Sequence, residues 1–175
     1  MNDQFNRFTL FIALLACLCV APEAKASNPA EPSLLEQSRQ LREQGLYRSA
    51  EQTLSILEQA RLEPAQRAAF QREWGLVLLG QGRLTEADQA FDEGLETASS
   101  AGLERLAGAL LNDKGTVAAA RGAPAAATSL FGRALESAQL SGDPVLAFTA
   151  ALNRARIAIE LRDIGLFESS LDAAL

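Results

Sequence analysis

Apolar positions after residue 33 recur at the spacing of a helix, and no stretch alternates as a strand would. Three segments carry apolar residues three or four positions apart: Leu46, Ala50, Leu54 and Leu57; Leu84, Ala87, Phe91 and Leu95; Ala127, Phe131, Ala134 and Leu135. An apolar stripe of this kind on a helix must be covered by a neighbouring helix. The strong helix formers Ala, Leu, Glu, Gln and Arg dominate these segments. The pattern therefore predicts an all-α fold.

Turn residues divide this region into eight expected helices. Glycine favours the left-handed conformation at helix ends, and proline is tolerated in a first turn. Residues of these two kinds occur at Gly45, Gly82, Gly122, Pro64, Pro124 and Pro144. Asp143 is expected to cap one helix and Thr85 another. The expected helices span 33–45, 47–62, 65–81, 84–99, 103–121, 124–140, 144–162 and 164–175.

The helical pattern also repeats. Each of the three turn glycines is followed at the fifth position by an alanine and four positions later by a large apolar residue. The three copies contain Ala50 and Leu54, Ala87 and Phe91, and Ala127 and Phe131. A period of roughly 20–50 residues indicates a solenoid or repeat array.

The spacing of the last two copies extends to the end of the chain. We call the sequence distance from Ala87 to Ala127 the repeat interval. One further repeat interval reaches Phe167 and Leu171, with Arg162 in place of the turn glycine. Gly165 offers an alternative turn, so two registers are open for the fourth unit.

These motifs resemble the tetratricopeptide repeat, which pairs W-x2-L-G-x2-Y in a first helix with A-x3-F in a second. The second unit matches through Trp74-Gly75, Leu78 and Ala87-x3-Phe91, and the third through Lys114-Gly115 and Ala127-x3-Phe131. The resemblance implies a right-handed α-α superhelix of about four helix pairs over residues 34–175. It also implies that the small residues Ser38, Gly75, Gly115 and Ala155 admit close approach of a partner helix, with Leu54, Phe91, Phe131 and Leu171 filling the adjoining space.

Residues 1–26 have the pattern of a secretory signal. The apolar run over residues 8–20 is too short to span a bilayer but suits the apolar region of a signal peptide. Ala24-Lys25-Ala26 predicts cleavage before Ser27, a flexible lead-in over 27–33, no membrane span after cleavage, and a periplasmic or secreted protein. A lipoprotein anchored at Cys17 is the alternative, because Leu14 to Cys17 resembles a lipobox.

Composition excludes several classes of function. The chain has 22 acidic and 16 basic residues, a net charge of −6, which argues against nucleic-acid binding. It has no histidine, and its two cysteines are Cys17 and Cys19 in the leader, so His-dependent nucleophilic catalysis and His-containing zinc sites are excluded. No phosphate loop, dinucleotide fingerprint or metal-ligand cluster is present, and we expect no catalytic residue, metal or cofactor.

The remaining interpretation is a non-enzymatic scaffold of the cell envelope that binds a protein or peptide. By the resemblance, first helices line a concave groove. The groove residues are expected to be Arg39, Arg72, Leu76, Leu79, Asn112, Arg156 and Ile159, beside Leu35, Arg42, Thr116, Ala119 and Leu152. The family's carboxylate clamp is not expected, because its lysines are absent. The alternative is a regulatory or substrate-recruiting part of a larger enzyme system, since such repeats look like those that precede CHAT-type peptidases.

Two further features bear on partners. The run Glu86, Asp88, Asp92, Glu93 and Glu96 has no basic residue within it and is expected to form a solvated face, with a basic partner or a cation site as alternatives. Residues 171–175 lie within an amphipathic helix that has no polar capping helix after it, whereas solenoids usually cap their last apolar face. This leaves open a partner, a homo-oligomer formed through the last helix, or further downstream sequence.

The repeat register predicts that Ala87→Leu overpacks its helix pair and lowers the free energy of unfolding by about 1–3 kcal/mol. Glu96→Gln, on the expected solvated face, should change stability by less than about 0.5 kcal/mol. Thermal unfolding followed by circular dichroism measures both. A wild-type melting temperature for Ala87→Leu would show that the register is wrong.

Overall fold

A computed structural model of the chain describes residues 33–58 and 60–173, and all regular structure within these ranges is helical. The helices are α2 (Leu34–Glu43), α3 (Tyr47–Glu58), α4 (Pro64–Gly80), α5 (Leu84–Ser100), α6 (Glu104–Ala120), α7 (Pro124–Ser141), α8 (Pro144–Leu161) and α9 (Ile164–Asp172). Each begins within one residue of its expected start. The predicted leader, its cleavage site, the Cys17 alternative and residues 27–32 of the lead-in lie outside the described residues.

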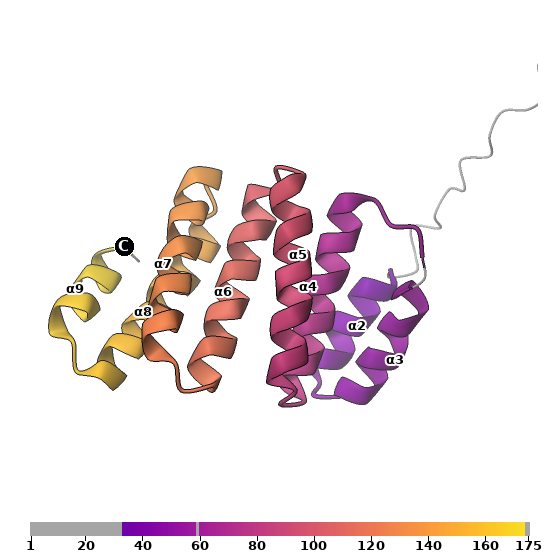
Figure 1. Cartoon of the computed structure of the whole chain (residues 1–175), viewed down its shortest axis with the longest axis horizontal. Coiled ribbons are helices and arrows are strands. Elements are labelled where there is room, and N and C mark those ends of the chain that lie inside the picture. The colour runs from indigo at the N-terminus through magenta and orange to yellow at the C-terminus, as the bar shows by residue number, and fades with distance from the viewer. Residues whose placement is uncertain (1–32, 59, 174–175) are drawn as a thin grey trace, which may run out of the picture. The chain divides into compact units, whose positions relative to one another are not determined.

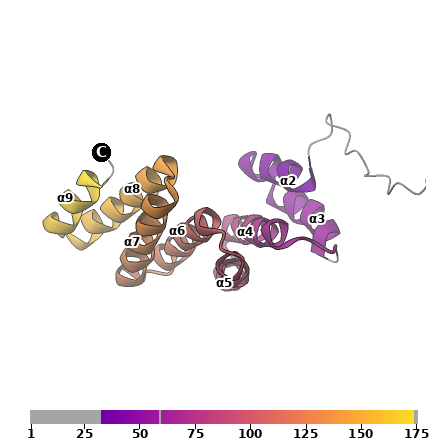
Figure 2. The same cartoon turned by 90° about the horizontal axis from the view of Figure 1, so that it is seen from above.

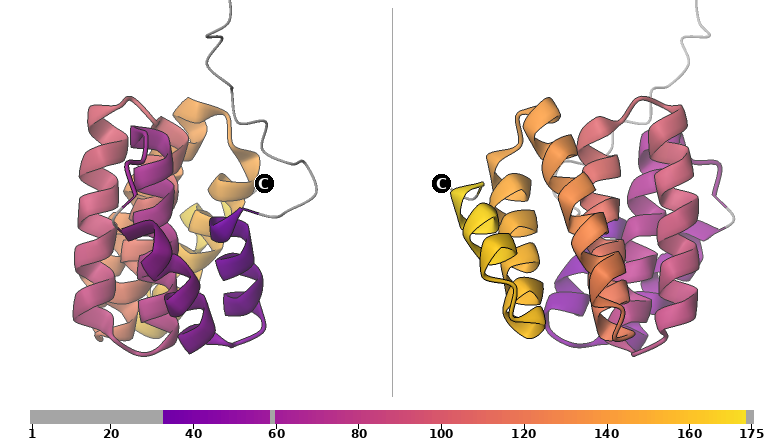
Figure 3. Two further views of the ribbon diagram at one scale, coloured as in Figure 1. Left: turned by 90° about the vertical axis from the view of Figure 1, so that its right-hand side faces the viewer. Right: turned by 60° about the vertical axis from the view of Figure 1, so that its left-hand side comes forward.

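The helices follow one another in chain order and pack in pairs (Figure 1). The first helices of the pairs are α2, α4, α6 and α8, and the second helices are α3, α5, α7 and α9. Each first helix also contacts the next first helix along the chain. From above, α5 lies beside α4 (Figure 2), and two further views place α9 against α8 at the end of the row (Figure 3). The expected all-α superhelix of helix pairs is confirmed.

Turn geometry settles the register of the fourth pair. Gly45, Gly82 and Gly122 all have positive φ, as expected, and Arg162 takes the same left-handed conformation with φ of 56°. The amide of Asp163 then donates to the carbonyl of Ala158 at 2.9 Å, which closes the end of α8. Gly165 lies inside α9 instead. The repeat interval therefore extends to the last pair, and the alternative turn at Gly165 is wrong.

One of the two expected helix caps is confirmed. The side chain of Asp143 accepts a hydrogen bond from the amide of Leu146 at 3.1 Å at the start of α8. Thr85 is not a cap, because α5 begins one residue earlier and Arg83 occupies the capping position. Gly102 and Gly142 also have positive φ and end the second helices α5 and α7, a role that the sequence pattern did not assign to them.

The small residues of the first helices lie under the large residues of the second. A Cβ added at Gly75 would come within 2.4 Å of the Phe91 ring, and one at Gly115 within 2.5 Å of the Phe131 ring. Both rings are fully buried, so they have no free space to move into. The expected close approach is confirmed for the α4–α5 and α6–α7 pairs, and it explains why glycine occupies a helix interior there despite its poor helix propensity.

Two glycines near Phe131 offer a matched test of this contact. Gly115→Ala should lower the free energy of unfolding by about 1–3 kcal/mol, because its methyl group collides with the buried Phe131 ring. Gly132→Ala should raise it by up to about 1 kcal/mol, because the added Cβ meets no atom within 4 Å and alanine is the better helix former. Urea denaturation measures both changes. Equal effects of the two substitutions would contradict the packing described here.

Candidate protein-binding surface

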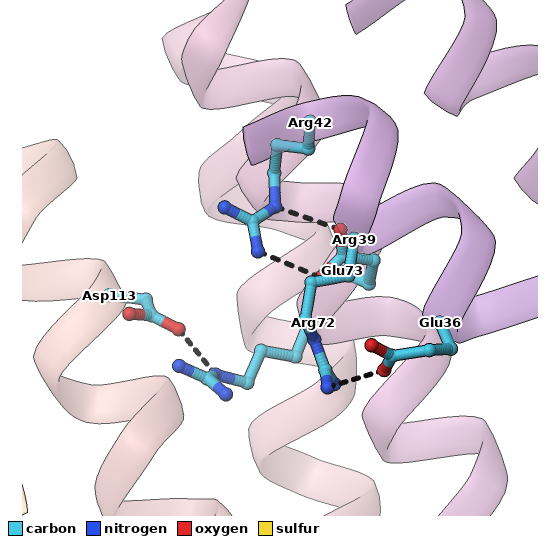
Figure 4. A network of polar contacts seen from close by, with 6 residues as sticks. All are labelled: Glu36, Arg39, Arg42, Arg72, Glu73 and Asp113. Carbon is cyan, nitrogen blue, oxygen red and sulfur yellow. Dashed lines mark hydrogen bonds and ion pairs between the residues drawn. The ribbon is translucent and has the colours of Figure 1, made fainter. Parts of the chain in front are cut away.

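Polar contacts join the first helices to one another. The Arg42 guanidinium of α2 donates to Glu73 of α4, with Nε 2.8 Å from Oε1. Nε of Arg72 in α4 lies 2.6 Å from Oδ2 of Asp113 in α6 (Figure 4). Asn153 of α8 donates to the side-chain oxygen of Asn112 in α6 at 3.0 Å. Each junction between successive first helices therefore has its own polar link.

The last two of these links occupy equivalent repeat positions, and the first shares only its acceptor position. Glu73, Asp113 and Asn153 are separated by one repeat interval each, and so are Arg72, Asn112 and Leu152. The pairs Arg72–Asp113 and Asn112–Asn153 are thus the same contact in two successive junctions, once charged and once neutral. The next residue in the series is apolar Leu152, and its side chain is 42% exposed.

The charged links are largely removed from solvent. The carboxylates of Glu73 and Asp113 are buried, while Arg42 and Arg72 remain partly exposed. Burial raises the pKa of Asp113 above its usual value, and the nearby Arg72 acts in the opposite direction. A buried carboxylate is costly without a partner. Arg72 therefore serves first to compensate Asp113, a role that reasoning within single helices did not reveal.

Four residues of the acidic run of α5 are exposed, as expected of a solvated face, and Asp88 is half-buried. Nζ of Lys114 lies 2.7 Å from a carboxylate oxygen of both Asp88 and Asp92, and Arg121 also donates to Asp88. Burial acts to raise the pKa of Asp88, but the hydrogen bonds from Lys114 and Arg121 outweigh it and leave the pKa below its usual value. The basic partner of this run, the lesser expectation, is therefore supplied by α6 of the same chain.

The expected groove residues have divided roles. Arg39 and Arg156 are exposed and pair with Glu36 and Glu160 on their own helices. Leu76 and Leu79 pack against the core between the α4–α5 pair and α6. Asn112 is buried and, like Arg72, is engaged with a neighbouring first helix. Of the seven residues, Arg39, Arg156 and Ile159 are the ones classed as exposed. The groove set does not form one continuous open surface.

The other expected groove positions differ in exposure. Leu35, Arg42, Thr116 and Ala119 are half-buried, whereas Leu152 is exposed. Arg72 also borders an open hollow of about 530 Å³ with Leu103, Leu106 and Ala109. Trp74 packs into the core, as expected, with its ring centroid 5.7 Å from that of Phe70.

The repeat register identifies a set of exposed apolar residues on the last two helices. It consists of Phe148, Leu152 and Ile159 on α8 with Leu171 on α9, and we call these four residues the terminal face. All four are exposed. Sequence reasoning found three of them but missed Phe148. Phe148 lies one repeat interval after Gly108, which is buried. A large apolar residue at the position of a glycine is the sequence signal that could have identified it.

No group of three or more His, Cys, Asp or Glu side chains in residues 33–58 and 60–173 is arranged to hold a metal ion. Among the described helices, none combines the length and apolarity that a membrane span requires.

Comparison with known proteins supports the helical-repeat fold. No protein-family profile matches the chain, and no curated protein sequence is significantly similar to it. The crystal structure of BtubC (BKLC) from P. vanneervenii is similar, with a TM-score of 0.69 and 15% sequence identity. The similarity covers 81% of this chain and 59% of BtubC, so the chain spans less than two thirds of that protein. At this identity the likeness shows the fold alone.

The two equivalent polar links suggest a double-mutant cycle. Arg72→Asn should lower the free energy of unfolding by about 3–5 kcal/mol, because it leaves the Asp113 carboxylate buried without its partner. Adding Asp113→Asn should recover much of this loss, since the resulting pair copies Asn112–Asn153 of the next junction. Urea denaturation of the two single variants and the double variant measures the coupling. Additive losses would show that the pair does not act as a unit.

Proposed function

We propose that this chain is a non-enzymatic protein-binding module whose terminal face takes an amphipathic helix of a partner protein. The observation that supports this is the change in exposure at α8. Ala68 of α4 and Gly108 of α6 are buried, whereas Phe148, at the equivalent position of α8, is 50% exposed. A Cβ added at Gly108 would lie 2.7 Å from Oγ of Ser137 on α7 and 2.9 Å from Leu146 on α8, so the paired second helix and the next first helix together cover this position of α6. By its register α9 is a second helix, so a next first helix is the part of this cover that the described residues do not supply to α8.

The last helix, α9, also has an exposed apolar residue where the earlier helices have a buried one. Leu54, Phe91 and Phe131 are fully buried at equivalent positions of α3, α5 and α7. Leu171 of α9 is 37% exposed at that position. A helix placed on α8 and α9 as α6 is placed on α4 and α5 would cover Phe148 and Leu171 together. The packing of the preceding pairs therefore supports a helix as the occupant.

The composition of the terminal face also supports a proposal for the chemistry of that helix. Inside the array the partner of Arg72 is a carboxylate and the partner of Asn112 is an amide. Leu152 of α8 is the equivalent of Arg72 and Asn112, so the partner helix is expected to place an apolar side chain opposite it. Arg156 and Glu160 border the face and would meet polar residues at the edge of the contact. An exposed apolar centre beside an arginine is a common composition of protein interfaces.

The sequence supports a location for the protein and a class of ligand. The leader pattern of residues 1–26 favours a periplasmic or secreted location, and the tetratricopeptide-like motifs favour recognition of a protein rather than a small molecule. Binding of a partner helix by a helical repeat is helix-in-groove recognition, in which a few apolar anchors supply most of the free energy.

A pair of exposed leucines provides the test. A photo-crosslinking amino acid at position 152 should link to one protein in the source cell, through residues on an apolar helical face. The same amino acid at position 140, on α7, should not, although Leu140 is 85% exposed. Leu152→Glu should then weaken binding of the purified partner by at least about tenfold, and Leu140→Glu should leave it unchanged.

Either of two results would contradict the proposal. One is equal crosslinking from positions 140 and 152. The other is a crosslink from position 152 to a second copy of this chain, together with a dimer in light scattering, since that would make the terminal face a self-association surface. Circular dichroism of Leu152→Glu should match the wild type, because the side chain is at the surface.

A further inference from the structure

Two contacts give the direction of a first helix relative to the one before it. A Cβ added at Gly108 of α6 would lie 2.9 Å from Cδ2 of Leu146 on α8. Further along both helices, Asn112 of α6 accepts a hydrogen bond from Asn153 of α8 at 3.0 Å. The contacts therefore advance toward the C-terminus of both helices, so α6 and α8 are parallel.

Three positions of a first helix face the helix pair that precedes it. In α8 the first, second and third of these positions hold Leu146, Asn153 and Ile157. The residue at the third position is buried in α4, α6 and α8, and it belongs to the same buried apolar cluster as the large residue of the preceding second helix. These cluster partners are Val77 with Leu54, Val117 with Phe91, and Ile157 with Phe131. A helix that continues the array therefore faces it with residues spaced by seven and then four positions.

The terminal face changes what the first position must hold. Phe148 occupies the place of Ala68 in α4 and Gly108 in α6. In the α6–α8 junction, the side chain of Leu146 already comes so close to Gly108 that even an added Cβ would collide with it. A leucine placed in the same way against Phe148 would overpack the contact, whereas a small residue would leave room for the ring.

The second and third positions would face apolar residues. Leu152 takes the place of Asn112, and Leu171 takes the place of Phe131. Both leucines are exposed. An apolar residue at the second position would therefore replace the amide of the internal link, and an aliphatic residue at the third would cover Leu171 as Ile157 covers the preceding pair.

We propose that the partner helix runs parallel to α8 and places a small residue against Phe148. Seven positions later it places an apolar residue against Leu152, and four positions after that an aliphatic residue against Leu171. This inference rests on the proposed function, in which a partner protein supplies a helix to the terminal face, and it adds the direction and the residue pattern of that helix. Residues at these spacings lie on one side of a helix, because seven residues make about two turns and eleven about three.

Two peptides copied from α8 provide the probes. Both contain residues 144–161 with Asn153→Leu, and both carry glutamine in place of the three outward-facing residues Phe148, Leu152 and Ile159. The small-residue peptide also has Leu146→Ala, whereas the large-residue peptide keeps this leucine. Alanine and leucine are both strong helix formers, so the two peptides differ chiefly in the volume at the first position.

Isothermal titration calorimetry compares the two peptides. The small-residue peptide should bind the protein at least about tenfold more tightly, although it has less apolar surface to bury. Equal binding, tighter binding of the large-residue peptide, or no binding of either peptide overturns the inference.

Phe148→Ala provides the reciprocal test. Alanine at this position copies Ala68, which lies in the same core cluster as Leu106, the residue at the first position of α6. The large-residue peptide should therefore bind this variant at least about tenfold more tightly than it binds the wild type. Leu140→Ala, at an exposed position of α7, should leave the preference for the small-residue peptide unchanged. An unchanged preference in Phe148→Ala overturns the inference, and circular dichroism checks that each variant is folded.

A nitroxide label on the small-residue peptide reports the direction of the bound helix. A label at the N-terminus of the peptide should broaden the amide resonance of Val145, at the start of α8, more than that of Leu161, at its end. A label at the C-terminus should do the reverse. The opposite result identifies an antiparallel helix and overturns the inference, but it leaves the proposed function intact, because the crosslink from position 152 tests that function separately. A dimer of the free protein that the peptide dissociates would identify a second copy as the occupant and contradict both.

Discussion

The contact between a first-helix glycine and the aromatic ring of the following helix sets the spacing of the two central helix pairs. With no side chain at Gly75 or Gly115, the rings of Phe91 and Phe131 lie directly over the helix backbone. The two helices of a pair can then approach closely enough to exclude water around fully buried alanines such as Ala87 and Ala127. Close packing of this kind has little tolerance for added volume. The repeat is therefore held in register by small residues as much as by large ones.

This spacing brings successive first helices into contact, and the contacts change character along the chain. The first two junctions use ion pairs, Arg42 with Glu73 and Arg72 with Asp113. The third uses the amides of Asn112 and Asn153, and the series ends on Leu152. Ion pairs and amide pairs need matched partners, so they specify which helix follows. Leucine needs only an apolar surface opposite it, so Leu152 places fewer constraints on its neighbour than the polar residues at the equivalent positions do.

Most of the fold was predictable from the sequence, because it depends on local spacing. The turn glycines, the prolines and the Ala-x3-Phe motifs each occupy a few adjacent positions and gave helix starts to within one residue. The polar links were not predictable in the same way, because Arg72 and Asp113 lie on different helices with the whole of α5 between them in the sequence. The repeat interval contained the necessary information, since it places Asp113 beside the position equivalent to Arg72. The relation between Arg72 and Asp113 is not visible when the charged residues are considered one helix at a time.

The candidate sites illustrate why repeats simplify the search for function. Within an array, most positions have two or more equivalents, and the equivalents show what each environment requires. Lys114 shows that a cation between a second helix and the next first helix is paired with carboxylates. Leu54, Phe91 and Phe131 show that a large apolar residue at their position is covered, so the exposed Leu171 is an exception among the described repeats. Comparison of equivalent positions therefore distinguishes an unusual exposed residue from the exposed apolar residues that every protein surface carries.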